Sequence, residues 1–143
     1  MTAGSGLAGK SQIAGSVVAG FPSPAEQYLE PPLDLNELLV RRPAATYFVK
    51  VEGDSMTGAG INQGDLLVVD RSLTPADGDI VIAAVDGEFT VKRYRTGFKT
   101  GADGRKRRFA ALEPANPAYP TITVQRGREL LMFGKVTAVI HRL

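Results

Sequence analysis

The sequence of 143 residues contains no cysteine, no tryptophan and a single histidine, His141. Without cysteine the chain has neither a disulfide framework nor thiolate chemistry, and one histidine makes a zinc or Cys-His site implausible. We therefore expect no metal and no other cofactor. Any nucleophilic chemistry in this chain has to come from serine or threonine.

The sequence also lacks long apolar runs. The longest, such as 66–69 and 80–85, fall well short of the roughly 20 residues that span a bilayer. The first twenty residues are rich in glycine and alanine and show no secretory signal pattern, so we expect a cytoplasmic protein without a membrane segment. A formal net charge of only +2 does not by itself argue for nucleic acid binding.

Prolines are concentrated in residues 1–45, which contain five of the nine. This density breaks long helices and disfavours a regular strand, so we interpret 1–45 as an extended arm. Only 33–40 has a helical pattern, with Asp34 as N-cap and Glu37 three residues later.

From Tyr47 onward, short apolar runs separated by turn residues predict a mostly-β domain, which we place at 46–143. Asp86-Gly87 predicts a type I′ hairpin, because both residues tolerate positive φ. The expected strands are 47–52, 64–70, 79–85, 88–95, 121–124 and 131–141.

Residues 97–108 are polar and basic, and end in Arg105-Lys106-Arg107-Arg108. We expect an exposed hairpin tip with solvated charges, although such a run could also contact phosphates.

Ser55 is the foremost candidate nucleophile. It follows a predicted strand in Gly53-Asp54-Ser55-Met56, where glycine permits a sharp turn that presents the hydroxyl and leaves backbone N–H groups free for an oxyanion. The alternative is an ordinary Gly-Asp-Ser turn.

Lys92 is the candidate base. Alternation places it on one strand face with Thr90 and Tyr94, from which it could reach a nearby serine. It acts as a base only if burial or a nearby positive charge makes it neutral; otherwise it is a solvated surface lysine. His141 lies two residues from the C-terminus without an evident carboxylate partner, so we expect an edge or surface role and no triad.

These features occur together in an ordered series of short motifs, which continues to the final segment 136–142. The series is Glu52-Gly53-Asp54-Ser55-Met56, Gly64-Asp65, Val68-Val69-Asp70, Gly78-Asp79-Ile80-Val81, Phe89-Thr90-Val91-Lys92-Arg93 and Leu112-Glu113-Pro114-Ala115-Asn116-Pro117. It resembles the self-cleaving Ser/Lys peptidase family of LexA and UmuD, most closely its UmuD-like members. The resemblance implies a curled, partly closed β-sheet peptidase domain and a homodimer.

Members of that family cut themselves at an Ala-Gly or Cys-Gly bond upstream of the nucleophile. The segment Val17-Val18-Ala19-Gly20-Phe21-Pro22 matches this pattern, so the resemblance implies cleavage between Ala19 and Gly20 by Ser55 and Lys92. Only nineteen residues precede Gly20, too few for the helix-turn-helix domain of a repressor, and we expect no sequence-specific DNA binding.

The resemblance further implies a role in the DNA-damage (SOS) response. A RecA-like recombinase filament would trigger cleavage, and the trimmed chain 20–143 would serve a Y-family, UmuC-like error-prone translesion polymerase. The alternative is a regulatory polymerase subunit that never cleaves and carries a vestigial Ser/Lys pair. A phage-type repressor fragment is a third possibility, which would require DNA binding.

Overall fold

The computed structural model describes residues 9–13, 15–17, 19–20, 30–124 and 129–143. The chain forms two compact units, Met1–Arg41 and Arg42–Leu143. The helices in the described ranges include none long and apolar enough to cross a bilayer.

The first unit contains two strands and one short helix. Strands β1 (Lys10–Ile13) and β2 (Glu30–Asp34) pair antiparallel, and helix α1 (Leu35–Leu39) follows directly. The Asp34 carboxylate accepts hydrogen bonds from the N–H groups of Asn36 (2.9 Å) and Glu37 (3.4 Å), which confirms the predicted N-cap.

Strand β2 corrects the expectation that the proline-rich arm holds no regular strand. The pairing register shifts between Ser11, which lies opposite Leu33, and Ile13, which lies opposite Glu30. Pro31 and Pro32 fall within this irregularity, on a strand with a single neighbour. Proline has no backbone N–H to donate to a neighbouring strand. A bulge and the open edge of a strand tolerate it, because the N–H at those positions is not needed for strand pairing.

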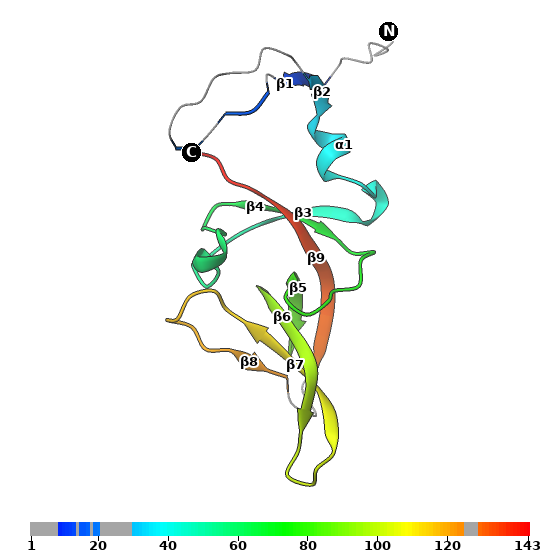
Figure 1. Cartoon of the computed structure of the whole chain (residues 1–143), viewed down its shortest axis with the longest axis vertical. Coiled ribbons are helices and arrows are strands. Elements are labelled where there is room, and N and C mark those ends of the chain that lie inside the picture. Colours follow the sequence, from blue (N-terminus) through cyan, green and yellow to red (C-terminus); the bar gives the residue numbers. More distant parts are fainter. Residues whose placement is uncertain (1–8, 14, 18, 21–29, 125–128) are drawn as a thin grey trace. The chain divides into compact units, whose positions relative to one another are not determined.

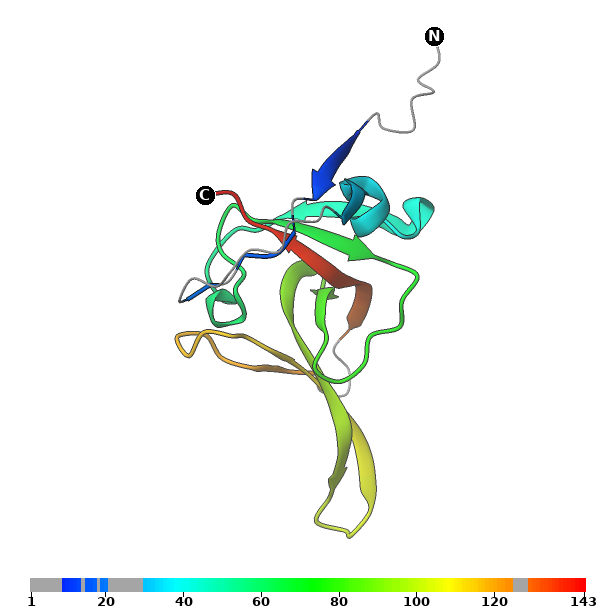
Figure 2. The ribbon, with the colours of Figure 1, turned by 45° about the horizontal axis from the view of Figure 1, so that its top comes forward.

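The second unit is built on one seven-stranded antiparallel sheet, with the order β3-β4-β9-β5-β6-β7-β8. Figure 1 shows the strands in sequence colours, and Figure 2 shows how strongly the sheet curls. The expected mostly-β, curled-sheet class is therefore confirmed. The elements are η1 (Pro43–Ala45), β3 (Thr46–Lys50), η2 (Thr57–Ala59), β4 (Leu66–Asp70), β5 (Ile80–Val85), β6 (Glu88–Thr100), β7 (Lys106–Glu113), β8 (Ile122–Thr123) and β9 (Leu130–Ile140).

Strand β9 contains two irregularities that favour bending of the sheet. Its register shifts once against β4, where Thr137 is the extra residue, and once against β5, where Phe133 is the extra residue. A bulge bends its strand and increases the local twist. Both extra residues are held by contacts: the Thr137 hydroxyl donates to the carbonyl of Val68 (3.4 Å), and the Phe133 ring packs edge-on against Tyr47 (5.0 Å between centroids).

Strand β5 separates two apolar clusters because its side chains alternate between the faces of the sheet. Ile82 contributes to the first cluster and Val81 to the second. The buried members of the first are Val51, Met56, Ile61, Leu67, Val69 and Ile82, and those of the second are Val81, Ala83, Val85 and Leu112.

Two hairpins flank β6. The first is the predicted one, with φ of 50° at Asp86 and 86° at Gly87 between the paired residues Val85 and Glu88. The second agrees with the expectation that 97–108 is an exposed hairpin tip, but the strands extend further into it than expected, because β6 and β7 continue pairing as far as Thr100 opposite Lys106. The turn itself is only 101–105, and most of the basic run lies on a strand.

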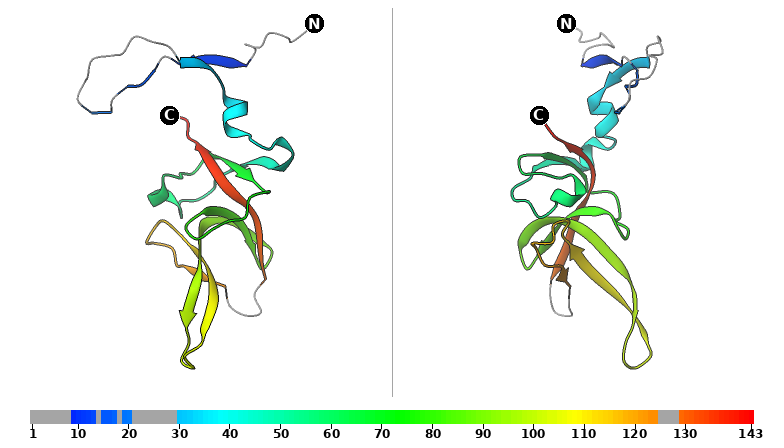
Figure 3. Two further views of the ribbon diagram at one scale, coloured as in Figure 1. Left: turned by 45° about the vertical axis from the view of Figure 1, so that its right-hand side comes forward. Right: turned by 60° about the vertical axis from the view of Figure 1, so that its left-hand side comes forward.

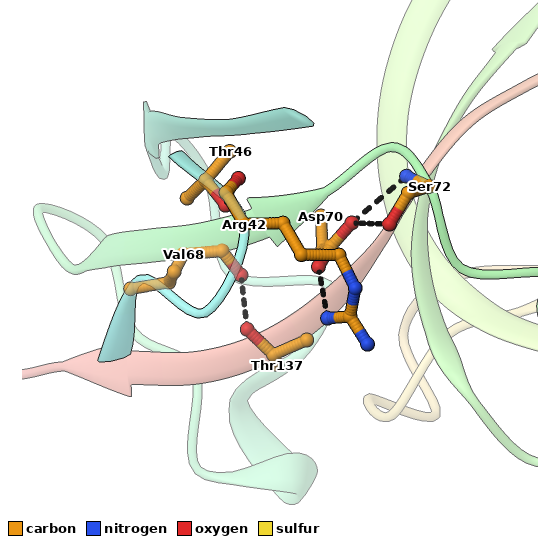
Figure 4. A network of polar contacts seen from close by, with 6 residues as sticks. All are labelled: Arg42, Thr46, Val68, Asp70, Ser72 and Thr137. Carbon is orange, nitrogen blue, oxygen red and sulfur yellow. Dashed lines mark hydrogen bonds and ion pairs between the residues drawn. The ribbon is translucent and has the colours of Figure 1, made fainter. Parts of the chain in front are cut away.

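A buried carboxylate ties the start of the second unit to β4. Asp70 is 3% exposed, accepts hydrogen bonds from the Ser72 N–H (2.8 Å) and hydroxyl (2.6 Å), and pairs with Arg42 at 2.9 Å, as Figure 4 shows. The hydrogen bond from the Ser72 hydroxyl is the main cause that lowers the pKa of Asp70.

We expect Asp70→Asn to lower the free energy of unfolding at neutral pH, because it removes the charge that Arg42 and Ser72 stabilise. A carboxylate with a lowered pKa stabilises the fold above its unfolded-state pKa of about 3.9 and loses that effect as the pH falls through its folded-state pKa. Urea unfolding of both chains should therefore give midpoints that converge in acid. A difference that stays constant down to the acid limit of the fold would contradict this account.

Candidate active site

Ser55 lies in the turn that follows the edge strand β3. Gly53, with φ of 85°, turns the chain after the strand, and the described Ser55 side chain is half-buried. The next residue, Met56, is 1% exposed in the first core cluster, so it anchors the turn. Truncation of a buried methionine to alanine lowers the free energy of unfolding by about 2–5 kcal/mol. Packing of Met56 therefore holds the backbone of the turn, and with it Ser55, in place.

Lys92 projects from β6 to the Ser55 hydroxyl. Its side chain is buried, with 8% exposure, and its Nζ lies 2.9 Å from the Ser55 Oγ. The amine also contacts the Thr90 Oγ1 (2.7 Å) and the Val91 carbonyl oxygen (3.1 Å). The contact with Thr90 confirms the predicted strand face, and the structure brings the two candidate residues together.

The surroundings of the amine favour its neutral form. Burial lowers the pKa of Lys92, and within the described part of the chain it forms an ion pair with no carboxylate. A neutral amine has two hydrogens and one lone pair. The hydrogens match the acceptors on Thr90 and Val91, which leaves the lone pair for the Ser55 hydroxyl proton.

Backbone hydrogen bonds join the serine turn to loop 114–120. The Ala115 N–H donates to the Ser55 carbonyl (2.8 Å), and the Gly58 N–H donates to the Ala115 carbonyl (2.6 Å). Gly58 permits this approach, because a Cβ at that position would lie 2.3 Å from the Ala115 oxygen. The loop therefore holds both sides of the residue that carries the hydroxyl.

Side chains from the same loop hold Asp54, the residue before Ser55. The Asn116 amide donates to the Asp54 carbonyl (2.9 Å), and the Tyr119 hydroxyl donates to the Asp54 carboxylate (2.5 Å). This hydrogen bond is the main cause that raises the pKa of Tyr119. Neither side chain is expected in this role from the sequence, because Asn116-Pro117-Ala118-Tyr119 shows no periodicity that indicates it.

The turn also presents candidate oxyanion donors. Among the bonds of the described residues, the N–H groups of Ser55 and Met56 donate to no protein acceptor. Two adjacent free N–H groups beside a hydroxyl are suited to hold a negative oxygen.

His141 corrects the expectation that it lacks a carboxylate partner. Its Nδ1 lies 2.5 Å from the carboxylate of Asp65, which is 2% exposed. The pairing of Leu66 with Ile140 brings these flanking residues together. The hydrogen bond from the Asn62 N–H, aided by His141, lowers the pKa of Asp65. His141 is engaged there, and the observed partner of Ser55 is Lys92.

The predicted cleavage bond belongs to the first unit. Ala19 and Gly20 are exposed and lie in a bend, and Val17 is 95% exposed. Val18, Phe21 and Pro22, the other residues of the predicted cleavage segment, lie outside the described residues. Across the described ranges, no group of acidic or histidine side chains is arranged to hold a metal ion.

A β-sheet domain that curls to place a serine hydroxyl against a buried lysine amine has the arrangement of a Ser/Lys hydrolase. Comparison with known proteins agrees with this class, because the model of the peptidase S24-like family matches residues 12–137. The chain belongs to this family, as a UmuD-like member of the LexA/UmuD group, and the predicted resemblance is confirmed. This membership supports a serine peptidase type of activity.

Individual relatives cover most of the chain. It is 54% identical to protein SamA of Salmonella typhimurium over 124 residues, which are 87% of this chain and 79% of the relative. It is 49% identical to protein ImpA of Escherichia coli over 124 residues, 87% of this chain and 78% of that protein. Identity to LexA repressor 1 of Geobacter sulfurreducens is 36% over 132 residues, 92% of this chain and 60% of the repressor.

We expect Lys92→Met to raise the free energy of unfolding near neutral pH, because burial penalises the charged amine and methionine carries no charge. The folded state binds fewer protons than the unfolded state between the lowered pKa of Lys92 and the unfolded value of about 10.4, so wild-type stability rises with pH in that window. The advantage of the variant should shrink as the pH approaches 10.4.

Urea unfolding between neutral and alkaline pH measures this difference. Lys50→Met, at an exposed position on β3, is the matched control for the loss of one lysine charge. A Lys92→Met advantage that is absent at neutral pH, or independent of pH, would show that the amine is not destabilised by its burial.

Proposed function

We propose that Ser55 and Lys92 form a catalytic dyad that cleaves this chain between Ala19 and Gly20. The observation that carries the proposal is the 2.9 Å separation between a serine Oγ and a buried lysine Nζ whose pKa is lowered by burial. Membership in a peptidase family supports the same chemistry.

In the first step the Ser55 Oγ attacks the carbonyl carbon of Ala19, and the hydroxyl proton passes to the Lys92 Nζ. The N–H groups of Ser55 and Met56 stabilise the resulting oxyanion. The Lys92 ammonium then gives its proton to the leaving nitrogen of Gly20. This breaks the peptide bond and leaves Ala19 as an ester on Ser55.

In the second step water hydrolyses the ester. Lys92 is neutral again and takes a proton from the attacking water, and the same oxyanion donors act a second time. Lys92 finally returns the proton to the Ser55 oxygen, which restores the dyad. The products are residues 1–19 and the trimmed chain 20–143.

The substrate is part of the same polypeptide, which explains how exposed small residues can suffice for recognition. A tethered segment is present at an effective concentration in the millimolar range for short flexible linkers, so the site needs little affinity for peptides in solution. The reaction therefore serves as a switch in the state of this protein, and general proteolysis is not its purpose.

The switch acts in the DNA-damage (SOS) response of the cytoplasm. A RecA-like recombinase filament promotes the cleavage of a homodimer, and the trimmed form serves as accessory subunit of a Y-family, UmuC-like translesion polymerase. The likeness to SamA, ImpA and LexA repressor 1 supports this assignment. Sequence-specific DNA binding is not part of the proposed role.

Incubation of the purified chain with an activated recombinase filament tests the proposal. Mass spectrometry should detect a fragment that begins at Gly20, and Ser55→Ala and Lys92→Ala should each reduce its rate at least about 10³-fold, because the two residues act as one unit. His141→Gln is the control, since His141 pairs with Asp65, and should still cleave.

Normal cleavage by a folded Ser55→Ala or Lys92→Ala chain would refute the dyad. A wild-type chain that is folded, binds the filament and yields no fragment would favour the alternative, a polymerase-regulatory subunit with a vestigial Ser/Lys pair.

Tyr119→Phe tests whether loop 114–120 positions the nucleophile. Loss of the hydroxyl that donates to Asp54 should slow cleavage about 2- to 10-fold, the range for one hydrogen bond, with little change in the melting temperature. Tyr94→Phe is the matched control, because the Tyr94 hydroxyl has no partner among the described residues. Equal rates for the two variants would contradict a positioning role.

A further inference from the structure

The outer part of the β6–β7 hairpin, residues 96–108, forms a two-stranded ribbon that we call the basic ribbon. Figure 1 and both views of Figure 3 show it projecting beyond the other strands of its sheet. It contains five cationic side chains and one carboxylate, a formal charge of +4, while the whole chain carries only +2. Positive charge is therefore segregated onto this ribbon, and the rest of the chain is net negative.

Cations at the base of the hairpin are already engaged. Arg95 pairs with Glu113 (3.4 Å) and Asp77 (3.8 Å), and Arg93 donates to the Gly78 carbonyl (2.8 Å). These contacts join the ribbon to the sheet. Because Arg93 and Arg95 are used in these contacts, the base of the hairpin is poorly suited to bind an external anion.

On one face of the ribbon the cations Lys99 and Arg107 already have partners within the ribbon or at its edge. The Lys99 Nζ lies 4.8 Å from the centroid of the Phe109 ring, and Arg107 forms a salt bridge with Asp103. Gly97 leaves room for the Phe109 ring, because a Cβ at this position would lie 3.1 Å from it. The only carboxylate of the ribbon is used on this face.

The opposite face presents an aromatic ring beside two cations that form no ion pair with a described carboxylate. Phe98 is 68% exposed and lies directly opposite Arg108, and Lys106 is the next residue on the same face. Neither cation pairs with a carboxylate in the described part of the chain. The Arg108 Nε donates to the Thr96 hydroxyl (3.3 Å), which holds the guanidinium beside the ring.

We propose that this face of the basic ribbon binds single-stranded nucleic acid without sequence preference. Lys106 and Arg108 contact successive phosphates, and the exposed Phe98 ring stacks on a base between them. An exposed aromatic flanked by cations is the combination that binds unpaired nucleotides, whereas a duplex keeps its bases stacked out of reach of the ring. Guanidinium also matches phosphate oxygens bidentately.

The charge pattern favours nucleic acid over two other polyanions. An anionic membrane surface would attract the two cations, but stable membrane binding gains most from a broad apolar face, and this face offers one aromatic ring. An acidic protein surface would satisfy the cations but would leave Phe98 without a partner of matching chemistry.

Fluorescence anisotropy with a labelled oligothymidylate of about 20 nucleotides tests the inference on the full chain. The double variant Lys106→Gln/Arg108→Gln should bind at least about tenfold more weakly at low salt, and the slope of log K against log salt should fall by about 1.4, or 0.7 per lost phosphate contact. Phe98→Ala should weaken binding about fivefold or more with the slope unchanged.

Lys50→Gln/Arg142→Gln is the matched control, because it removes two exposed cations elsewhere in the same unit. It should retain most of the wild-type affinity. Ser55→Ala should bind like wild type, so this experiment succeeds or fails independently of the proposed cleavage.

Four results would overturn the inference. They are wild-type binding no tighter than that of the double variant, an equal loss in the control, tighter binding to a duplex of the same length, and equal competition by polyglutamate or by anionic lipid vesicles. Unchanged melting temperatures of the variants establish that the fold is intact in each comparison.

Discussion

The contact between Ser55 and Lys92 depends on the curl of the seven-stranded sheet. Strands β4, β9 and β5 lie between β3, which leads to Ser55, and β6, which carries Lys92. In a flat sheet with strands about 4.8 Å apart, β3 and β6 would be separated by about 19 Å. The Ser55 Oγ and the Lys92 Nζ are nevertheless 2.9 Å apart. The bulges of β9 and the core between the curled strands therefore create the site.

Burial also sets the chemistry of the lysine. Met56 follows Ser55 and Val91 precedes Lys92, and both pack into the first core cluster, which holds the backbone beside each side chain. Lys92 itself lies opposite Val81 of the second cluster, so its side chain leaves β6 on the other face. Burial of the amine there lowers its pKa.

Sequence patterns predicted what depends on local order. Alternation placed Lys92 with Thr90, the Asp86-Gly87 pair predicted its hairpin, and Gly53 marked the turn at Ser55. The missed features join distant parts of the chain: Asp65 meets His141 only through the pairing of β4 with β9, and Tyr119 reaches Asp54 across 65 residues. The alternation within one segment does not show which distant segment it will pair with, or in which register. The β2 prolines were misjudged because their tolerance depends on edge position and a bulge.

Strand β6 carries both the candidate base and the proposed nucleic acid face, yet the two functions are electrostatically separate. Lys92 and Phe98 are six residues apart, or about 20 Å along an extended strand. This exceeds the Debye length of about 8 Å at physiological ionic strength. The ribbon's charge is thus screened from the amine, which agrees with burial as the cause of its lowered pKa. A phosphate bound at the ribbon would therefore have little effect on the pKa of Lys92, so the proposed nucleic acid binding and the proposed cleavage can be tested separately.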